Sequence, residues 1–337
     1  MATPTTIQVG TRSSKLAMVQ ARAVVAALEE ANPGVKFVID ARETAGDRDK
    51  VTPLPALGKG LWTSEFEARL VSGGLDIVVH SAKDMPTSLP EGCILGATLE
   101  REDARDAIIF APGAPYKTLD DLAPGSVVGT SSVRRSAQLK RRYANLVFKD
   151  LRGNIDTRLR KLDAPEAGAT KYDCIILAAA GLKRMNFDDR ISQLLDHESS
   201  GTLHAVGQGA LGIEIREGDA NVLAMLKKIT HEPTMLACLA ERAVMRALEG
   251  GCSVPIGVES SLGGADNNEL RLRATVVSLD GKTAVDADET RTVKTAAEAE
   301  ALGLNVAQTM VNQGAQAILD EINKNRVTPP AVAVASS

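Results

Sequence analysis

Val127-Val128-Gly129-Thr130-Ser131-Ser132-Val133-Arg134-Arg135 is an apolar run that ends at a glycine and continues into hydroxyl residues and two arginines. Paired valines favour a strand, and Ser or Thr before the first helical residue is a typical N-cap. The stretch therefore predicts a strand followed at once by a helix. The N–H groups and the positive dipole end of that helix would face whatever lies beyond the strand.

A similar stretch near the N-terminus reads Val9-Gly10-Thr11-Arg12-Ser13-Ser14. Two such junctions predict two similar α/β domains whose anion-binding helix starts face each other across a hinged cleft. The simpler alternative is that Gly-Thr-Ser recurs only because it starts helices well.

A basic run follows the first of these stretches. From Arg134 to Lys161 there are ten Arg and Lys residues and two Asp residues, whereas the whole chain has a formal net charge of −4. The excess predicts a bound polyanion. Arg134, Arg135 and Arg152 lie at predicted helix starts, where the dipole disfavours cations, so they are interpreted as carboxylate or phosphate binders, with a solvated helix face as the alternative. Five other basic residues of this run are interpreted as part of solvent-exposed helix faces. They are Lys140, Arg141, Arg142, Arg160 and Lys161.

Composition excludes several classes of protein. No apolar stretch approaches the ~20 residues of a membrane helix. Aromatic residues make up 3% of the chain, and the basic run contains only Tyr143 and Phe148, which argues against single-stranded nucleic acid as the partner. The four cysteines and four histidines show no metal-ligand spacing, and residues 1–6 do not resemble a secretory signal. We therefore expect a cytoplasmic protein without a bound metal.

Strands alternate with helices through the first two thirds of the chain, which predicts mostly parallel sheets. A helix after the first strand carries Leu16, Val19, Ala23 and Ala27 at helical spacing. The expected strands are residues 7–9, 37–39, 75–79, 107–110, 127–128 and 174–177.

The pattern changes after a strand at 211–215. It predicts a helix from Pro233 to Leu248, a strand over 270–279, a hairpin turn at Asp280-Gly281, a second strand, and one long helix over 296–323. This is a small α+β domain. Residues 46–60 are polar and broken by Pro and Gly, which predicts a mobile lid.

Two places could carry chemistry. Lys83 and Asp84 follow an apolar strand directly, where open α/β sheets bind their ligands; the alternative is a structural ion pair. Asp84 among cations would stay ionised and could stabilise positive charge in a substrate. Cys252 follows two glycines on a loop and is the credible covalent site, whereas Cys93, Cys174 and Cys238 lie in apolar settings. Residues 207–212 match G-x-G-x-x-G but lead into a strand, so a nicotinamide site is rejected.

Together these residues resemble the porphobilinogen deaminase family over nearly the whole chain. The stretches that carry the resemblance are 9–14, 58–61, 79–86, 129–135, 152–154, 205–209 and 249–255. The resemblance implies two hinged, binding-protein-like α/β domains and a small α+β C-terminal domain. We expect domain 1 to comprise residues 1–100 and 209–228 with a lid at 46–61, domain 2 residues 104–204, domain 3 residues 231–326, and a disordered tail at 327–337.

The resemblance also implies an activity: condensation of four porphobilinogen molecules with loss of ammonia, and hydrolytic release of hydroxymethylbilane. A dipyrromethane cofactor would be attached to Cys252 by a thioether, and Asp84 would be the catalytic residue. Each pyrrole carries an acetate and a propionate, so a growing chain is a polycarboxylate. The residues implied to bind these carboxylates are Arg12, Ser14, Lys83, Ser131, Ser132, Arg134, Arg135, Arg152, Arg184 and Gln208.

One departure from the family pattern concerns the lid. The family commonly has Gly-Leu-Phe-x-Lys-Glu, whereas this chain has Trp62 and Ser64 in place of Phe and Lys. We expect a monomer that binds porphobilinogen and neither nucleic acid nor membrane. The alternatives are a non-catalytic binding protein for a small anion, and an RNA-binding protein with steeply salt-dependent affinity.

Overall fold

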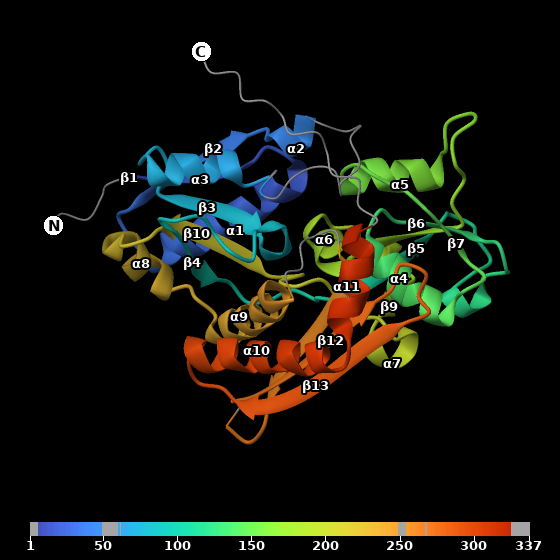
Figure 1. The fold of residues 1–337 in the computed structure, drawn as a ribbon. Coiled ribbons are helices and arrows are strands. Elements are labelled where there is room, and N and C mark those ends of the chain that lie inside the picture. Colours follow the sequence, from blue (N-terminus) through green and yellow to red (C-terminus); the bar gives the residue numbers. More distant parts are fainter. Residues whose placement is uncertain (1–5, 49–59, 61, 249–253, 267, 325–337) are drawn as a thin grey trace, which may run out of the picture.

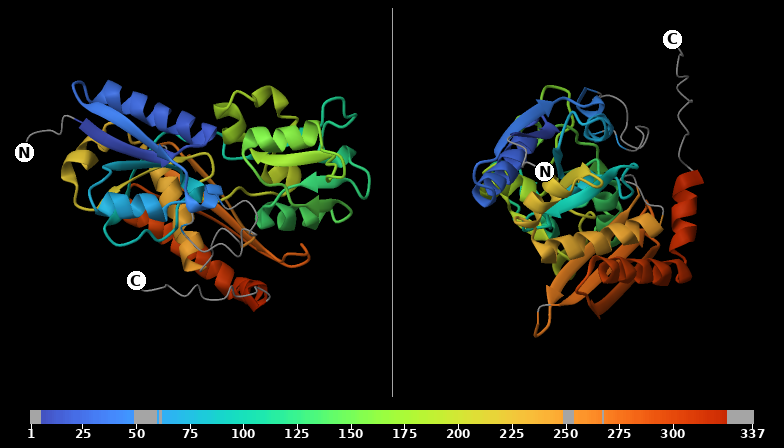
Figure 2. Two further views of the ribbon diagram at one scale, coloured as in Figure 1. Left: turned by 90° about the horizontal axis from the view of Figure 1, so that it is seen from above. Right: turned by 90° about the vertical axis from the view of Figure 1, so that its left-hand side faces the viewer.

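Three sheets organise the chain. The computed structural model describes residues 6–48, 60, 62–248, 254–266 and 268–324. Each sheet takes its strands from the range expected for one domain, and we number the domains accordingly. Domains 1 and 2 lie side by side, with domain 3 against both (Figures 1 and 2). The expected class, two α/β domains and a smaller α+β domain, is confirmed.

The sheet of domain 1 has the strand order β2-β1-β3-β10-β4. β1 is parallel to β2 and β3, whereas β10 is antiparallel to β3 and β4. The strands are β1 (Thr6–Arg12), β2 (Lys36–Arg42), β3 (Ile77–Ser81), β4 (Cys93–Thr98) and β10 (Leu211–Arg216). The helices are α1 (Lys15–Ala31), α2 (Ala45–Arg48), α3 (Ser64–Val71), the 3₁₀ turn η2 (Ala82–Asp84) and α8 (Ala220–Lys227).

Domain 2 repeats this arrangement with the order β7-β6-β8-β5-β9. β6 is parallel to β7 and β8, and β5 is antiparallel to β8 and β9. The strands are β5 (Asp106–Phe110), β6 (Val127–Gly129), β7 (Val147–Lys149), β8 (Cys174–Ala178) and β9 (Gln193–Leu195). The helices are η3 (Leu119–Asp121), α4 (Val133–Arg142), α5 (Ile155–Asp163), α6 (Ala179–Arg184), η4 (Asp188–Arg190) and α7 (His197–Ser200).

The prediction of mostly parallel sheets was wrong in part, and the two crossings between the domains explain why. Residues 99–105 lead from β4 into β5, and residues 196–210 lead back into β10. The strand that enters each sheet after a crossing runs antiparallel to both of its neighbours. Gly209 lies at the second crossing, where a Cβ atom would be 2.3 Å from the carbonyl oxygen of Glu102 on the first. The two crossing segments therefore pack backbone against backbone.

Domain 3 is an antiparallel sheet, β11-β12-β13, packed against helices. Its elements are α9 (Glu232–Ala247), β11 (Ile256–Gly263), β12 (Glu269–Val277), β13 (Ala284–Thr292), α10 (Ala296–Asn312) and α11 (Ala315–Lys324). Pro233 in the first turn of α9 and the turn at Asp280-Gly281 confirm two predictions. The long helix expected over 296–323 is two helices, because Gly314 takes a left-handed conformation with φ +97°.

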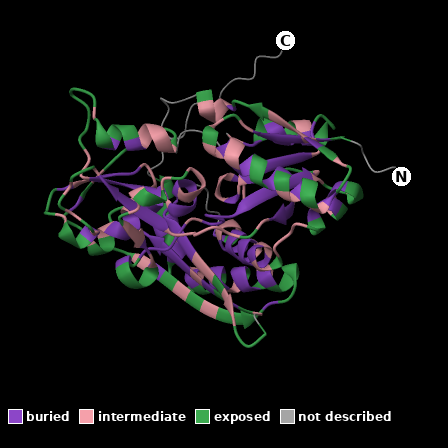
Figure 3. Cartoon of the chain, turned by 180° about the vertical axis from the view of Figure 1, so that it is seen from behind, coloured by how far each residue is buried: buried purple, intermediate pink, exposed green. Residues whose placement is uncertain are grey.

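Burial follows the sheets and the inner faces of the helices (Figure 3). Two details differ from the sequence prediction. β3 begins and ends two residues later than expected, so His80 and Ser81 belong to the strand. The buried face of α1 is not the expected one either; it consists of Ala17, Gln20, Ala21, Val24, Val25 and Leu28.

Domain 3 contacts domain 2 through part of the basic run. Lys140 Nζ donates to the carbonyl oxygen of Leu279 at 2.9 Å, and Arg141 pairs with Asp286 at 3.0 Å. Gly281 approaches so closely that a Cβ atom would lie 2.7 Å from Lys140 Cβ. The end of α4 is therefore a docking surface for the β12–β13 hairpin, which corrects the interpretation of Lys140 and Arg141 as a solvated face.

Three predictions concern residues that the structure does not describe, or describes only in part. Most of the expected lid, the Cys252 loop and the whole expected tail lie outside the described residues. The described part of the lid begins as α2. Among the helices in the described part of the chain, none is long and apolar enough to cross a membrane.

Candidate active site

Asp84 ends the 3₁₀ turn that follows β3, as the strand-end interpretation expected. Its carboxylate is 35% exposed, and Oδ2 lies 4.0 Å from Arg12 Nη1. Lys83 Nζ is 3.5 Å from Gln208 Oε1. No ion pair joins Lys83 to Asp84, both of which are described residues, so the structural-pair alternative is not supported. The carboxylate is therefore accessible and next to a cation.

Arg12 is the last residue of β1, two residues before the N-cap of α1, and it contacts Asp47 and Trp62. Its Nε donates to Asp47 Oδ2 at 3.1 Å, Nη2 also bonds to Asp47, and its guanidinium carbon lies 5.8 Å from the Trp62 ring centroid. Burial alone would lower the pKa of Arg12, but the hydrogen bond to Asp47 and the charges of Asp84 and Asp47 raise it. Arg12 therefore stays fully charged beside Asp84.

Asp106, at the start of β5, is the centre of a buried charge network that sequence reasoning missed. Arg134 Nη1 donates to it at 2.8 Å, Arg135 Nε and Nη2 at 3.0 and 2.7 Å, and Gln208 Nε2 at 2.8 Å. Burial would raise the pKa of Asp106, but the two arginines hold it far below its usual range. Arg134 and Arg135 thus bind a carboxylate, as their type suggested, but it is one of the protein's own.

Lys83 faces this network from domain 1. Burial lowers the pKa of Lys83 to about 8; Asp84 and Asp106 oppose the shift, whereas Arg135 and Arg134 add to it. Because two arginines share one Asp106 carboxylate, the network keeps an excess positive charge close to Lys83. An additional anion would relieve that excess.

The hydroxyl residues at the helix starts have definite partners. Ser14 and Ser132 are the N-caps of α1 and α4, each accepting a backbone N–H bond at 3.4 Å. Ser131 Oγ accepts from the Leu151 N–H at 3.0 Å, which ties the two junctions of domain 2 together. In these bonds the hydroxyl oxygens accept and the hydroxyl protons are not used, so each hydroxyl can also donate a hydrogen bond to a carboxylate.

Three further arginines lie on domain 2. Arg184 Nη2 donates to the carbonyl oxygen of Gly209 at 2.7 Å, and burial lowers its pKa against the opposing charge of Glu102. Arg158 lies in the basic run from Arg134 to Lys161 but was not among the site residues predicted from the sequence; its Nε donates to the carbonyl oxygen of Gly153 at 2.6 Å. Burial lowers the pKa of Arg158 to about 10, with Arg135 and Arg152 adding to the shift and Asp84 opposing it. Arg158 and Arg152 are therefore part of the same electrostatic site.

The site combines one accessible carboxylate with an excess of cations. The cations are Arg12, Lys83, Arg134, Arg135, Arg152, Arg158 and Arg184; the carboxylates that interact with them are Asp47, Asp84, Glu102 and Asp106. Arg158 lies in the basic run from Arg134 to Lys161, and Asp106 directly precedes the apolar run 107–110, so the sequence places both residues beside features that it did identify. Such a site suits a substrate with several carboxylates and a reacting centre that becomes positive.

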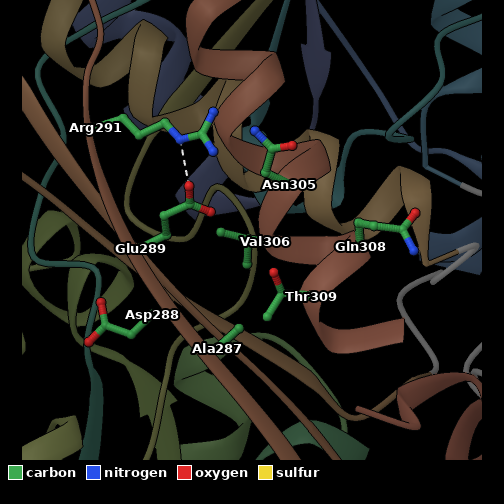
Figure 4. A pocket seen from close by; sticks show the side chains of 8 residues that line it. All are labelled: Ala287, Asp288, Glu289, Arg291, Asn305, Val306, Gln308 and Thr309. Atoms are coloured by element: carbon green, nitrogen blue, oxygen red, sulfur yellow. Dashed lines mark hydrogen bonds and ion pairs between the residues drawn. The ribbon is translucent and has the colours of Figure 1, made fainter. Parts of the chain in front are cut away.

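Two surface hollows lie away from these residues. One of about 380 Å³ lies between β13 and α10 and is lined by residues such as Glu289 and Arg291, which pair with each other (Figure 4). The other, of about 540 Å³, lies between domains 2 and 3 and includes Arg141 and Asp286. Neither contains a predicted site residue.

The three cysteines expected to be structural are buried free thiols. Burial raises the pKa of Cys93, Cys174 and Cys238 to about 12 in each case. Such thiols are poor nucleophiles at neutral pH. Cys252 lies outside the described residues, so its role stays a prediction.

Comparison with known proteins decides the family. The model described as "Porphobilinogen deaminase, dipyromethane cofactor binding domain" matches residues 7–224, and "Porphobilinogen deaminase, C-terminal domain" matches residues 235–312. The chain belongs to the porphobilinogen deaminase family. The resemblance seen in the sequence is thereby confirmed, as is the cofactor it implied, which the first description names. The chain is an enzyme of this family.

Curated relatives agree over almost the full length. A porphobilinogen deaminase of Neurospora crassa is 53% identical over 335 residues, covering 98% of this chain and 97% of that protein. Those of Yarrowia lipolytica and Saccharomyces cerevisiae are 52% and 47% identical, covering 95% and 96% of this chain and 94% and 99% of those proteins. Among solved structures, the VFT2 domain of Bordetella pertussis BvgS is 16% identical with a TM-score of 0.38, covering 69% of this chain and 91% of that one.

Proposed function

We propose that the chain is a transferase that joins four porphobilinogen molecules head to tail, with loss of ammonia at each step, and releases linear hydroxymethylbilane by hydrolysis. Family membership supports the reaction class. The observation that carries the residue assignments is the accessible Asp84 carboxylate 4.0 Å from Arg12, within a site rich in cations. A polycarboxylate substrate and a developing positive charge both fit this arrangement.

The donor set fits the dipyrromethane cofactor. Two linked pyrroles bring four carboxylates, and the cations of the site outnumber its own carboxylates. When bound, the group supplies the pyrrole to which the first substrate is joined. The residues that would hold its carboxylates, and later those of the product, are Ser14, Lys83, Ser131, Ser132, Arg134, Arg135, Arg152, Arg158, Arg184 and Gln208. Its attachment to Cys252 rests on the family motif alone.

Arg12 and Asp84 would have different roles toward the incoming substrate: Arg12 binds it, and Asp84 takes part in the reaction. Arg12 offers a planar fork that binds a carboxylate in bidentate fashion and thereby orients the pyrrole. The Asp84 carboxylate would accept a hydrogen bond from the pyrrole N–H. It would also stabilise the positive charge that develops on the substrate as the bond to the leaving amine breaks and ammonia departs. After the new C–C bond forms, the same carboxylate can take the proton released from the ring carbon. Lys83, with its pKa lowered to about 8, stays largely protonated at neutral pH.

We also propose a cytoplasmic monomer. The free thiols of Cys93, Cys174 and Cys238 support a reducing compartment. Sedimentation at micromolar concentration tests the oligomeric state, and a dimer mass would contradict it. Fractionation of cells that express the full chain tests the compartment, which recovery of the protein with an organelle would refute.

The intact mass of the denatured protein tests the function. A thioether survives denaturation, so the mass should exceed that of the polypeptide by two linked pyrrole units on the Cys252 peptide. Porphobilinogen should add single-pyrrole steps. Cys252→Ala should lose both the excess mass and the activity, whereas the control Cys93→Ala should keep both. An active wild-type enzyme with an unmodified mass would refute the attachment.

A further inference from the structure

Two carboxylates of the protein itself lie against the guanidinium of Arg12. Its Nε and Nη2 both bond to Asp47, so the pair is bidentate, and Nε lies 3.1 Å from Oδ2. Its Nη1 lies 4.0 Å from Asp84. Asp47 uses the Nε and Nη2 edge of the guanidinium, and Asp84 lies beside Nη1 at the second edge, so no edge that could bind a substrate carboxylate in bidentate fashion is clear of the protein's own carboxylates. Asp47 and a substrate carboxylate therefore compete for one position.

Trp62 restricts how a ligand can reach Arg12. The indole ring lies over the guanidinium, with its centroid 5.8 Å from the guanidinium carbon. The ring also lies against the backbone beside Asp47, because a Cβ atom on Gly46 would be 2.3 Å from Trp62 Nε1. One face of the guanidinium is thus covered by an aromatic ring that prefers a cation. A carboxylate has to approach in the plane of the fork, where Asp47 is.

Asp47 keeps partners of its own when Arg12 is taken away. Its Oδ2 also accepts from Thr44 N at 3.1 Å and from Thr44 Oγ1 at 2.9 Å. The side chains of Arg12 and Asp47 are 23% and 15% exposed, so water reaches both. A carboxylate with two remaining donors and access to water is not left as an unpaired buried charge. The exchange is therefore feasible within the folded enzyme.

We propose that Asp47 is a positioning residue that holds Arg12 in the ligand-free enzyme and is exchanged for a substrate carboxylate whenever porphobilinogen binds. The proposal rests on the proposed function, because it takes Arg12 as a substrate-binding residue. Elongation repeats the same binding step, and Asp47 returns to Arg12 each time the newly added unit moves on. Arg12 is thereby paired for most of each cycle, and the competition with Asp47 weakens substrate binding.

The variant Asp47→Asn tests the competition, because it keeps the size of the side chain and removes its charge. If Arg12 is free in about 10% of wild-type molecules, removal of the competitor lowers KM about 10-fold and leaves kcat nearly unchanged. Steady-state kinetics of the holoenzyme with porphobilinogen measure both constants. The matched control is Asp40→Asn, since Asp40 pairs with Arg42 and Arg69 outside the site. The control should leave KM unchanged.

A second measurement needs no turnover. Trp62 is the only tryptophan of the chain, so its fluorescence reports on Arg12 directly. Glutarate, a dicarboxylate without a pyrrole, should change this emission, with half-saturation at about 10-fold lower concentration in Asp47→Asn than in wild type. Asp40→Asn should match the wild type.

The outcomes separate the possibilities. A raised KM or a lowered kcat in Asp47→Asn would mean that Asp47 contacts the substrate itself, and this overturns the proposal. If both KM and the glutarate half-saturation are unchanged in Asp47→Asn, the Arg12–Asp47 pair is only structural, and the proposal is overturned as well. A wild-type holoenzyme that does not turn over porphobilinogen but shows the glutarate shift would support the exchange and refute the proposed function.

Discussion

Asp106→Asn should destabilise the protein strongly. Asp106 is 2% exposed and accepts hydrogen bonds from two buried arginines and from Gln208. Asparagine keeps the shape and one acceptor oxygen, but it leaves Arg134 and Arg135 without a counter-charge and turns an N–H₂ group toward one of them. Removing one partner of a buried ion pair costs about 3–5 kcal/mol. Because one acceptor remains, we expect about 3–4 kcal/mol here, a large part of the ~5–15 kcal/mol typical of a folded protein.

Urea unfolding followed by circular dichroism measures this loss, and in a separate thermal unfolding experiment Tm should fall by roughly 5 °C. The matched control is Asp103→Asn, three residues away, whose ion-pair partners Arg105 and Lys183 are 42% and 37% exposed. A partly exposed pair contributes about 1 kcal/mol or less. Equal losses in the two variants, or a loss below about 1 kcal/mol for Asp106→Asn, would refute the reasoning.

The pH dependence gives an independent check. Burial would raise the pKa of Asp106, but Arg134 and Arg135 lower it well below the unfolded value of about 3.9. The stabilisation from this carboxylate is therefore fully present above pH ~4 and is lost as the pH falls toward the folded pKa. The difference between wild type and Asp106→Asn should narrow as the pH falls below about 4. A constant difference from pH 7 to pH 2 would contradict the assignment.

Three further predictions concern the site and a domain contact. Asp84→Asn should fold normally and lose roughly 10²-fold in turnover, and near-wild-type turnover would end its catalytic assignment. With the Lys83 pKa at about 8, kcat/KM for porphobilinogen should fall as the pH rises through that value; Lys83→Arg should remove this fall, and an unchanged profile would exclude Lys83 as its cause. Gly281→Ala should cost about 1–3 kcal/mol more in urea unfolding than Gly113→Ala, because both glycines have positive φ but only Gly281 touches Lys140; equal costs would argue against the contact.

The helix starts could be predicted from the sequence because their signals are local. Ser14 and Ser132 cap helices where the Gly-Thr-Ser pattern indicated, and Asp84 lies at the end of its strand. In α1, local signals were insufficient. Alanines occur on several faces of that helix, so apolar spacing alone could not select the buried one.

The partners of the arginines could not be predicted, because they are distant in sequence. Asp106 lies 28 residues from Arg134, and Gln208 lies 102 residues from Asp106. Nothing in the basic run itself distinguishes an arginine that binds a ligand from one that binds an aspartate of the same protein. Likewise, the docking of Gly281 on α4 joins segments that only the completed fold brings together.

The position of β10 has a consequence for synthesis on the ribosome. β10 lies between β3 and β4 in the first sheet, yet it follows the whole of domain 2 in the chain. About 110 residues separate Thr98 from Leu211. At about 5–20 residues per second, the first sheet waits roughly 5–20 s for β10, the strand that joins β4 to the rest of the sheet, whereas domain 2 already has all of its strands.

Domain 2 is therefore expected to fold first, and the N-terminal strands stay incompletely paired until it has done so. Hydrogen exchange on a nascent chain stalled with residue 204 outside the ribosome should show protection in β5–β9 and little in β1–β4. Full protection of β1–β4 at that length would contradict this order. The domain that is translated first is thus the later of the two to be completed.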